Sequence, residues 1–324
     1  MKYLTIDGIE NQQPVKIEVS PLILGSGDFF QFNPENVTKM LDTFVEIGGN
    51  TLDTAHQYIR GEEIIGQWMK ERGNREKITI LTKGAHNDDG EPGKRVNPQS
   101  ITKDLFESLE RLQTTYIDLY ALHRDDEEVE VGPILEILNE HIKAGRIKAI
   151  GVSNWTTQRL EEANVYAKEH NLIPFTFNSP NLSLAKCLIP RWPGCVSADE
   201  EMVHYHENHQ LPLLAWSSQA GGFFSGAFTP ENRENQEMVE VYYSEENWER
   251  FDRAKELAAK LGVTPIQVAL SYVLNQSFPT AAIIGPEKVT ELMSSFKGSQ
   301  LELSHDIVKW LDLRIAEKPV LLNS

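Results

Sequence analysis

Residues 117–154 read IDLYALHRDDEEVEVGPILEILNEHIKAGRIKAIGVSN and show how the whole chain is organised. The apolar run 117–122 ends at His123, and a second apolar run, 147–152, ends at Ser153. Between these runs, residues 134–144 carry apolar side chains at helical spacing. Two strands that are apolar throughout and are joined by a helical crossover are typical of a parallel sheet covered by helices.

The same strand-and-helix unit occurs eight times after Ser20. The predicted strands span 22–24, 51–53, 78–83, 117–122, 147–152, 174–177, 211–215 and 281–284. No G-x-G-x-x-G motif follows the first strand, and eight units favour a closed (β/α)8 TIM barrel over an open Rossmann sheet. We therefore predict a single α/β domain over residues 1–324.

The spacing of apolar residues and the cap residues also predict where the helices begin and end. Those with two predicted ends span 34–47, 63–69, 98–112, 134–144, 198–209 and 248–261, and two others end near 170 and 296. Residues 266–274 predict an extra helix between the seventh and eighth units. Residues 1–19 predict a β-hairpin that turns at Asp7-Gly8 and plugs the barrel floor.

Composition limits the partners. The net charge of −17 argues against nucleic acid and anionic membranes, because both require a basic surface. The chain has no signal-peptide pattern and no run near the about 18 apolar residues of a membrane helix, so we expect a cytoplasmic protein that binds small molecules. Cys187 and Cys195 form no CxxC motif and are expected to be reduced thiols, although a bridge between them stays open. We expect no metal site, and the sequence allows a homo-oligomer without requiring one.

Polar side chains that end neighbouring strands are the main functional signal. Asp53, Lys83 and His123 end three consecutive apolar strands. Alone, such an Asp is usually a helix cap, such a Lys faces solvent, and such a His bonds to backbone. Together they would lie on the C-terminal rim of the barrel, where catalytic groups of this fold are found.

Four stretches of the chain resemble the signatures of the aldo-keto reductase superfamily. They are GNTLDTA at 49–55 with Tyr58, Gly61, Glu63 and Gly66; IDLYALH at 117–123 with GRI at 145–147 and GVSN at 151–154; WSSQAGG at 216–222 with Gly226; and IGP at 284–286 with Glu291 and Leu292. The resemblance runs in the family's order from about Val19 to Phe296. It implies a reductase of aldehydes, ketones or sugars that uses NADP or NAD, with polyols as substrates of the reverse reaction.

The resemblance also implies catalytic roles. Tyr58 would be the general acid, Lys83 and Asp53 would tune it, and His123 would orient the substrate as a neutral donor. The chemistry fits, because reduction of a carbonyl leaves an alkoxide that must be protonated. A free phenol with a pKa of about 10 is a weak acid at neutral pH, and an adjacent ammonium favours its ionised form.

For the coenzyme, the resemblance assigns two regions. Ser153 and Asn154 match the pair that binds the carboxamide, and Trp216 matches the aromatic residue that stacks on the nicotinamide; the alternative for Trp216 is a packed aromatic on the rim. Other matched positions are Ser217, Gln219, Gly222 and Glu291. Gly285 and Pro286 are expected to open a helix whose N–H groups bind phosphate.

Three positions depart from the family pattern. Ser179 stands where the family usually has the Gln that holds the carboxamide, and Ser295 replaces an Asn that contacts adenine. Glu287, followed by Lys288, stands where an Arg typically pairs with the 2′-phosphate of NADP. Glu287 is either an acidic residue in the first turn of a helix, which the helix macrodipole favours, or it bonds a ribose hydroxyl and repels phosphate. The second interpretation weakens the family's default for NADP.

Several alternatives stay open. Lys83 could instead form a Schiff base in a barrel aldolase, or the chain could be a cofactor-binding regulatory protein of the same fold. Residues 182–197 form a long loop that is either a substrate lid or a structural Ω-loop. The acidic tract 125–128 either disfavours anionic substrates or is a solvated run of charge.

Overall fold

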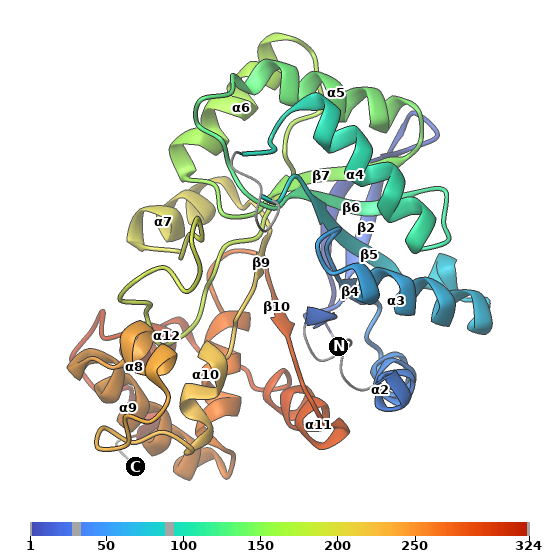
Figure 1. The fold of residues 1–324 in the computed structure, drawn as a ribbon. Coiled ribbons are helices and arrows are strands. Elements are labelled where there is room, and N and C mark those ends of the chain that lie inside the picture. The colour runs from blue at the N-terminus through green and yellow to red at the C-terminus, as the bar shows by residue number, and fades with distance from the viewer. Residues whose placement is uncertain (1, 28–33, 88–93, 323–324) are drawn as a thin grey trace.

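A computed structural model of the chain describes residues 2–27, 34–87 and 94–322. Eight parallel strands form a closed barrel in the order β10-β3-β4-β5-β6-β7-β8-β9, which confirms the predicted TIM barrel (Figure 1). The strands are β3 (Leu22–Gly25), β4 (Thr51–Asp53), β5 (Thr79–Gly84), β6 (Ile117–Leu122), β7 (Ile147–Val152), β8 (Phe177–Asn178), β9 (Leu213–Ala215) and β10 (Thr280–Ile284). The predicted sixth strand, 174–177, is wrong by three residues at its start, since β8 begins only at Phe177.

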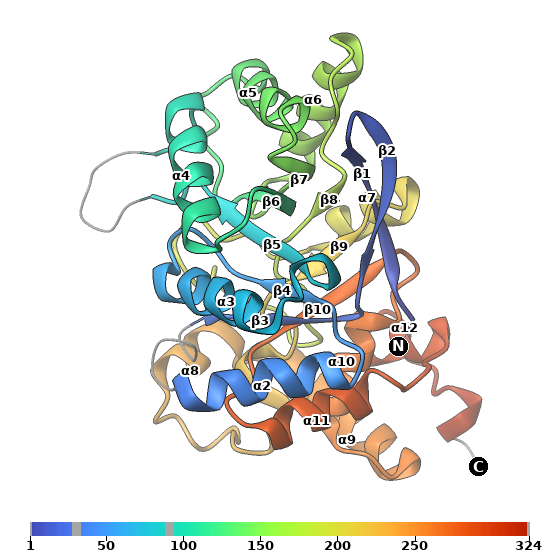
Figure 2. The same cartoon turned by 90° about the vertical axis from the view of Figure 1, so that its right-hand side faces the viewer.

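Helices surround the barrel (Figures 1 and 2). They are α2 (Pro34–Glu46), α3 (Ile59–Arg72), α4 (Pro98–Arg111), α5 (Val131–Lys143), α6 (Thr157–Glu169), α7 (Glu200–His209), α8 (Gln236–Tyr242), α9 (Glu245–Leu261), α10 (Pro265–Leu274), α11 (Val289–Gly298) and α12 (His305–Leu311). The extra helix predicted over 266–274 is α10. Helices α8 and α12 were not predicted, because seven residues give too few turns to show a period.

Within residues 2–27, 34–87 and 94–322, no single helix is both long and apolar enough to cross a membrane. The pair α9 and α10, bent by 101°, passes only when taken together, and only by length and composition.

The N-terminal hairpin consists of β1 (Leu4–Glu10) and β2 (Gln13–Val19). The predicted turn at Asp7-Gly8 is wrong, because these residues lie inside β1 and the chain reverses at Asn11 and Gln12, with φ of 50° and 61°. A Cβ on Gly8 would lie 2.8 Å from Cδ1 of Ile17 and 3.0 Å from the carbonyl oxygen of Lys148. Gly8 is therefore needed for close packing of the hairpin against β7, not for a turn.

The hairpin plugs the barrel floor, as predicted (Figure 2). Ile6, Ile17 and Val19 are buried in one cluster with the barrel-filling side chains. These are Ile23, Leu81, Leu119, Ala121, Ala149, Phe177, Leu214, Ala281 and Ile283.

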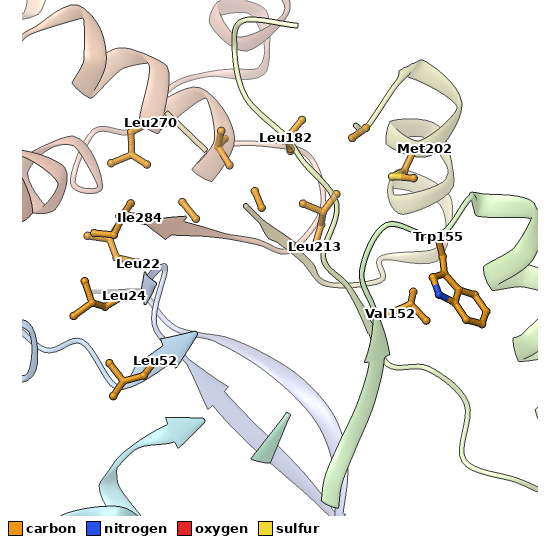
Figure 3. Packing of buried hydrophobic residues seen from close by; sticks show 14 of the residues in the cluster. Leu22, Leu24, Leu52, Val152, Trp155, Leu182, Met202, Leu213, Leu270 and Ile284 are labelled. Atoms are coloured by element: carbon orange, nitrogen blue, oxygen red, sulfur yellow. The ribbon is translucent and has the colours of Figure 1, made fainter. Parts of the chain in front are cut away.

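A second, larger cluster lies between strands and helices. Along β3, Leu22 and Leu24 belong to this outer cluster, whereas Ile23 belongs to the inner one. Figure 3 shows the outer cluster, in which strand residues such as Ile284 meet Leu270 of α10. Because side chains alternate along a strand, a strand buried on both faces is apolar throughout, which explains the continuous runs in the sequence.

The two-residue strand β8 is held by a buried histidine of α7. Nδ1 of His206 donates to the Leu211 carbonyl at 2.7 Å, and Nε2 accepts from Nδ2 of Asn178 at 3.2 Å. Burial lowers the pKa of His206 to about 4, although the bond to Leu211 opposes this shift. The side chain is therefore neutral in the folded protein at neutral pH.

We expect His206 to make the fold acid-sensitive. The folded pKa of about 4 lies below the unfolded value of about 6.5, so its contribution is complete above pH 6.5 and is lost as the pH falls toward 4. That loss is about 3 kcal/mol of unfolding free energy. Urea titrations of His206→Gln should show a flatter pH dependence over this window than wild type. His170→Gln, at an exposed histidine, should keep the wild-type slope, and equal slopes for all three proteins would contradict the assignment.

Candidate active site

Strand alternation places the key side chains inside the barrel mouth. Lys83 lies two residues after Leu81, and His123 lies two residues after Ala121, and both apolar residues fill the barrel interior. Lys83 on β5 pairs in register with Ala121 on β6, so the two polar side chains project from neighbouring strands. All of Asp53, Lys83 and His123 are less than 8% exposed.

Lys83 and Asp53 form a buried ion pair. The Lys83 ammonium donates to Oδ1 of Asp53 and, at 2.9 Å, to the Thr54 carbonyl. Burial raises the pKa of the Asp53 carboxyl, and the neighbouring Lys83 ammonium opposes that shift. The Lys83 ammonium therefore favours the ionised form of the buried Asp53 carboxyl.

Tyr58 lies beside this pair at the start of α3. Its N–H donates to the Ala55 carbonyl at 2.7 Å, which closes a tight turn directly after β4. The ring meets the His123 ring edge-on at 5.9 Å between centroids, and Nζ of Lys83 lies 6.0 Å from the Tyr58 ring centroid. The structure thus brings the four predicted catalytic side chains together.

His123 is held uncharged. Burial, and then the positive charges of Lys83, His86 and Arg124, hold its pKa well below 6.5. Nδ1 of His123 is buried and has no hydrogen-bond partner among the described residues. A neutral imidazole in this position can donate to or accept from a substrate oxygen.

The structure adds one histidine that sequence reasoning missed. His86 follows β5 by two residues, and its ring lies 4.7 Å from that of His123. The signal that could have found it is its place in the loop directly after β5, which ends at Gly84, one residue past Lys83.

Ser153 and Asn154, at the end of β7, form a linked network. The Ser153 hydroxyl donates to the Ser179 carbonyl at 2.6 Å, and Nδ2 of Asn154 donates to Oγ of Ser153 and to the His123 carbonyl, both at 3.1 Å. The Ser179 hydroxyl is buried and donates to the Leu214 carbonyl at 2.8 Å. Ser179 therefore uses its only hydroxyl donor within the barrel wall, and its oxygen can act further only as an acceptor.

The loop after β9 has an unusual backbone. Ser217, Ala220, Gly221 and Gly222 all have positive φ, and residues 220–225 form the short 3-10 helix η2. Gln219 precedes this helix, and its carbonyl accepts from the Gly222 N–H at 3.0 Å. Successive N–H groups in such a conformation form concave anion sites.

Trp216 begins this loop. Its backbone N–H donates to the Pro180 carbonyl at 3.2 Å, which fixes it beside the end of β8. Its indole Nε1 is buried without a hydrogen-bond partner among the described residues. Trp216 as a whole is half-buried.

Comparison with known proteins agrees with this geometry. The family model described as "Aldo/keto reductase family" matches residues 21–313. The chain belongs to the aldo/keto reductase family. The family assignment and its relatives make it an oxidoreductase.

Three curated relatives show the range of this likeness. "Uncharacterized oxidoreductase YrpG" of Bacillus subtilis is 27% identical over 309 residues, which cover 91% of this chain and 92% of the relative. "Norsolorinic acid reductase B" of Aspergillus parasiticus is 27% identical, covering 91% and 81%. "Protein tas" of Escherichia coli is 27% identical, covering 90% and 93%.

At the end of β10, this aldo/keto reductase differs from the expectation. Gly285 and Pro286 do not open a helix, because α11 begins at Val289 with Lys288 as its N-cap. The Glu287 N–H donates to Oε2 of Glu291 at 2.9 Å, so a carboxylate of the chain itself occupies this donor. Glu287, Lys288 and Glu291 are exposed, whereas Ser295 is buried within α11.

The loop 182–197 of this aldo/keto reductase crosses the barrel mouth. The Val196 N–H donates to Oδ1 of Asn154 at 3.1 Å, and the Trp192 ring lies 5.7 Å from that of Trp216. A Cβ on Gly194 would lie 3.4 Å from Cδ of Arg124. The loop therefore contacts the ends of β6, β7 and β9.

Part of the acidic tract is committed to ion pairs. Asp125 pairs with Arg159 at 3.5 Å, and Asp126 pairs with Lys94 at 3.0 Å. Glu127 and Glu128 are exposed. These contacts favour a structural and solvated tract over one that screens substrates.

Proposed function

We propose that this aldo/keto reductase transfers a hydride between a nicotinamide coenzyme and the carbonyl of an aldehyde, ketone or sugar, or oxidises a polyol in the reverse direction. The observation that carries the proposal is the grouping of Tyr58, the Lys83–Asp53 ion pair and neutral His123 at the barrel mouth. A proton donor, a fixed positive charge and a neutral hydrogen-bonding group are what carbonyl reduction requires.

The residues present fit a bound coenzyme. The buried Nε1 of Trp216 lacks a partner among the described residues, and Gly221 and Gly222 leave the backbone of the following loop uncovered by side chains. Ser153, Asn154 and Trp216 would hold the nicotinamide end, with Ser217, Gln219 and Gly222 near the diphosphate. The group 285–295, through Glu287, Lys288, Glu291 and Ser295, would contact the adenosine end.

When bound, the coenzyme supplies the hydride. His123 orients the substrate by a hydrogen bond to its carbonyl oxygen. Tyr58 transfers its phenolic proton to that oxygen as negative charge develops there. Lys83 stabilises the phenolate that remains, and Asp53 holds the Lys83 ammonium in place and compensates its charge.

Two alternatives fit less well. An aldolase nucleophile must be a free amine, but Lys83 donates to Asp53 and to the Thr54 carbonyl as an ammonium would. A regulatory protein that only senses coenzyme has no need of the complete catalytic group.

The test is a turnover panel of aldehydes, ketones and sugars with NADPH and NADH, and of polyols with NADP⁺ and NAD⁺, followed by coenzyme absorbance. Coenzyme-dependent reduction of any carbonyl class supports the proposal. Borohydride trapping of a substrate on Lys83, with no coenzyme oxidation, would replace it with the aldolase.

We further propose that Glu287 weakens the NADP preference and can reverse it toward NAD. Its exposed carboxylate would repel a 2′-phosphate, and Glu291 adds a second negative charge beside it. Glu287→Arg would instead offer a bidentate grip on phosphate. We expect this change to shift the ratio of kcat/KM values toward NADPH by about ten- to a hundredfold.

The measurement is the ratio of specificity constants for the two coenzymes in both proteins. Lys297→Arg, at an exposed lysine of α11, serves as the control and should leave the ratio unchanged. A wild-type enzyme with strong NADPH preference that Glu287→Arg does not alter would eliminate the idea.

A further inference from the structure

We propose that Arg191, from the loop between β8 and α7, binds the diphosphate of the coenzyme and supplies the positive charge for it. This inference rests on the proposed function, because it assumes a dinucleotide coenzyme. Arg191 lies outside every motif that carried the family resemblance.

The loop that carries Arg191 is fixed at its base. The Lys186 N–H donates to Oδ1 of Asn247, and Nδ2 of Asn247 donates back to the Lys186 carbonyl, both at 2.8 Å. The Leu188 N–H donates to the Val241 carbonyl at 2.8 Å. These bonds tie the loop to α8 and α9 before it reaches Arg191.

Arg191 points onto the loop that follows β9. Its Nη1 donates to the Ser217 hydroxyl at 2.9 Å, and the side chain is only 16% exposed. A Cβ on Gly221 would lie 3.3 Å from Nη2 and 3.4 Å from Nη1 of Arg191. The guanidinium therefore lies against the backbone of the Ser217–Gly222 segment, which a side chain at Gly221 would disturb.

This segment needs a cation from elsewhere. Residues 217–226 read SSQAGGFFSG and contain no Lys or Arg, and the chain as a whole carries a net charge of −17. A diphosphate carries two negative charges, and backbone N–H groups offer dipoles but no net charge. A guanidinium matches the spacing of phosphate oxygens and forms strong charge-assisted bonds with them.

Arg191 is also pre-positioned. Its Cζ lies 4.7 Å from the Trp192 ring centroid, and Trp192 in turn packs on Trp216. Stacking on an aromatic ring reduces the conformational freedom that the guanidinium loses when it binds. Trp192 thus packs against Trp216, the residue proposed to contact nicotinamide, and Arg191 places a positive charge beside Ser217.

The present partner of Arg191 can be displaced. Nε of Arg191 bonds to Oε1 of Glu237 at 2.9 Å, and the Glu237 side chain is 51% exposed. Because half of the Glu237 side chain is exposed, water can solvate this carboxylate when Arg191 binds another anion. Arg191 can therefore exchange Glu237 for a diphosphate, whose two negative charges attract the guanidinium more strongly than one carboxylate does.

The experiment measures dissociation constants of NADH, NADPH and ADP-ribose by calorimetry, at low and high salt, for the full-length protein. We expect Arg191→Met to weaken all three by about ten- to a hundredfold, because all share the diphosphate, and to reduce the salt dependence of binding. Arg191→Lys should lose less than Arg191→Met. Glu237→Gln should bind as tightly as wild type or more tightly.

Arg72→Met is the matched control for a general loss of positive charge, since Arg72 is 40% exposed and pairs with Asp42 at 2.7 Å at the C-terminal end of α3. Wild-type affinity in Arg191→Met would overturn the inference while leaving the proposed function intact. If Arg191→Met weakens binding without changing its salt dependence, and Glu237→Gln weakens binding equally, then Arg191 only fixes the loop in place. That result would also overturn the inference. A wild-type protein that binds none of the three ligands would overturn the proposed function as well.

Discussion

Replacing Tyr58 with phenylalanine is expected to lower kcat for carbonyl reduction by about 10²–10⁴-fold, the usual contribution of a positioned general acid. The ring packs edge-on against His123, and that contact survives the change. The hydroxyl is the group whose proton would reach the substrate oxygen. The coenzyme dissociation constant should therefore change little while turnover collapses.

The measurement pairs steady-state kinetics with quenching of tryptophan fluorescence by coenzyme. Tyr205→Phe is the matched control, because its hydroxyl bonds to Glu161 at 2.8 Å on the outer helices. The control should retain full turnover. A Tyr58→Phe enzyme with near wild-type kcat would show that another group donates the proton.

Replacing Lys83 with methionine is expected to cost about 3–5 kcal/mol of stability and most of the activity, since it leaves a buried charge without its partner. Asp53 is 6% exposed, and burial alone raises the pKa of its carboxyl. Without Lys83, Asp53 must be protonated or remain as an uncompensated charge. The phenolate left on Tyr58 also loses its stabilising ammonium.

A double variant separates the two effects. Asp53→Asn combined with Lys83→Met removes both charges, so unfolding in urea should show part of the lost stability restored while turnover stays low. Lys148→Met is the control, because Lys148 pairs with Asp118 at 3.2 Å at the far end of the barrel. A Lys83→Met protein as stable and active as wild type would refute the role of the pair.

Local sequence was enough to predict the barrel and most strands. The strands β6 and β7 match the predicted 117–122 and 147–152 at both ends, because both faces of each strand are buried and polar residues mark the ends. Prediction was weaker for β8. Its two residues pair with β7 and β9 only through closure of the barrel, and no local pattern encodes that closure.

The hairpin turn was misplaced for a similar reason. Asp7-Gly8 has the composition of a turn, but Gly8 serves the close approach of Lys148, which is far away in sequence. The helix start after β10 was also placed too early. Gly285 and Pro286 end the strand, but the chain runs on to Lys288 before α11 begins.

The four predicted catalytic residues could be chosen from sequence because Asp53, Lys83 and His123 lie at or just after strand ends, Tyr58 stands in a family motif, and parallel strands end on one rim. Their physical state was not in the sequence. The low pKa of His123 arises from its burial and from Lys83, His86 and Arg124, which come from two different strand ends. Desolvation and charge depend on neighbours in space.

The sequence by itself determined the fold class, the family and the places of Asp53, Lys83 and His123 at the barrel mouth, because these depend on local periodicity and on the residues at strand ends. Only the tertiary structure decided which groups meet there. Arg191 and Ser217 lie 26 residues apart, and no local pattern links them. They meet because the closed barrel sets the ends of β8 and β9 side by side, so that one loop folds across the next.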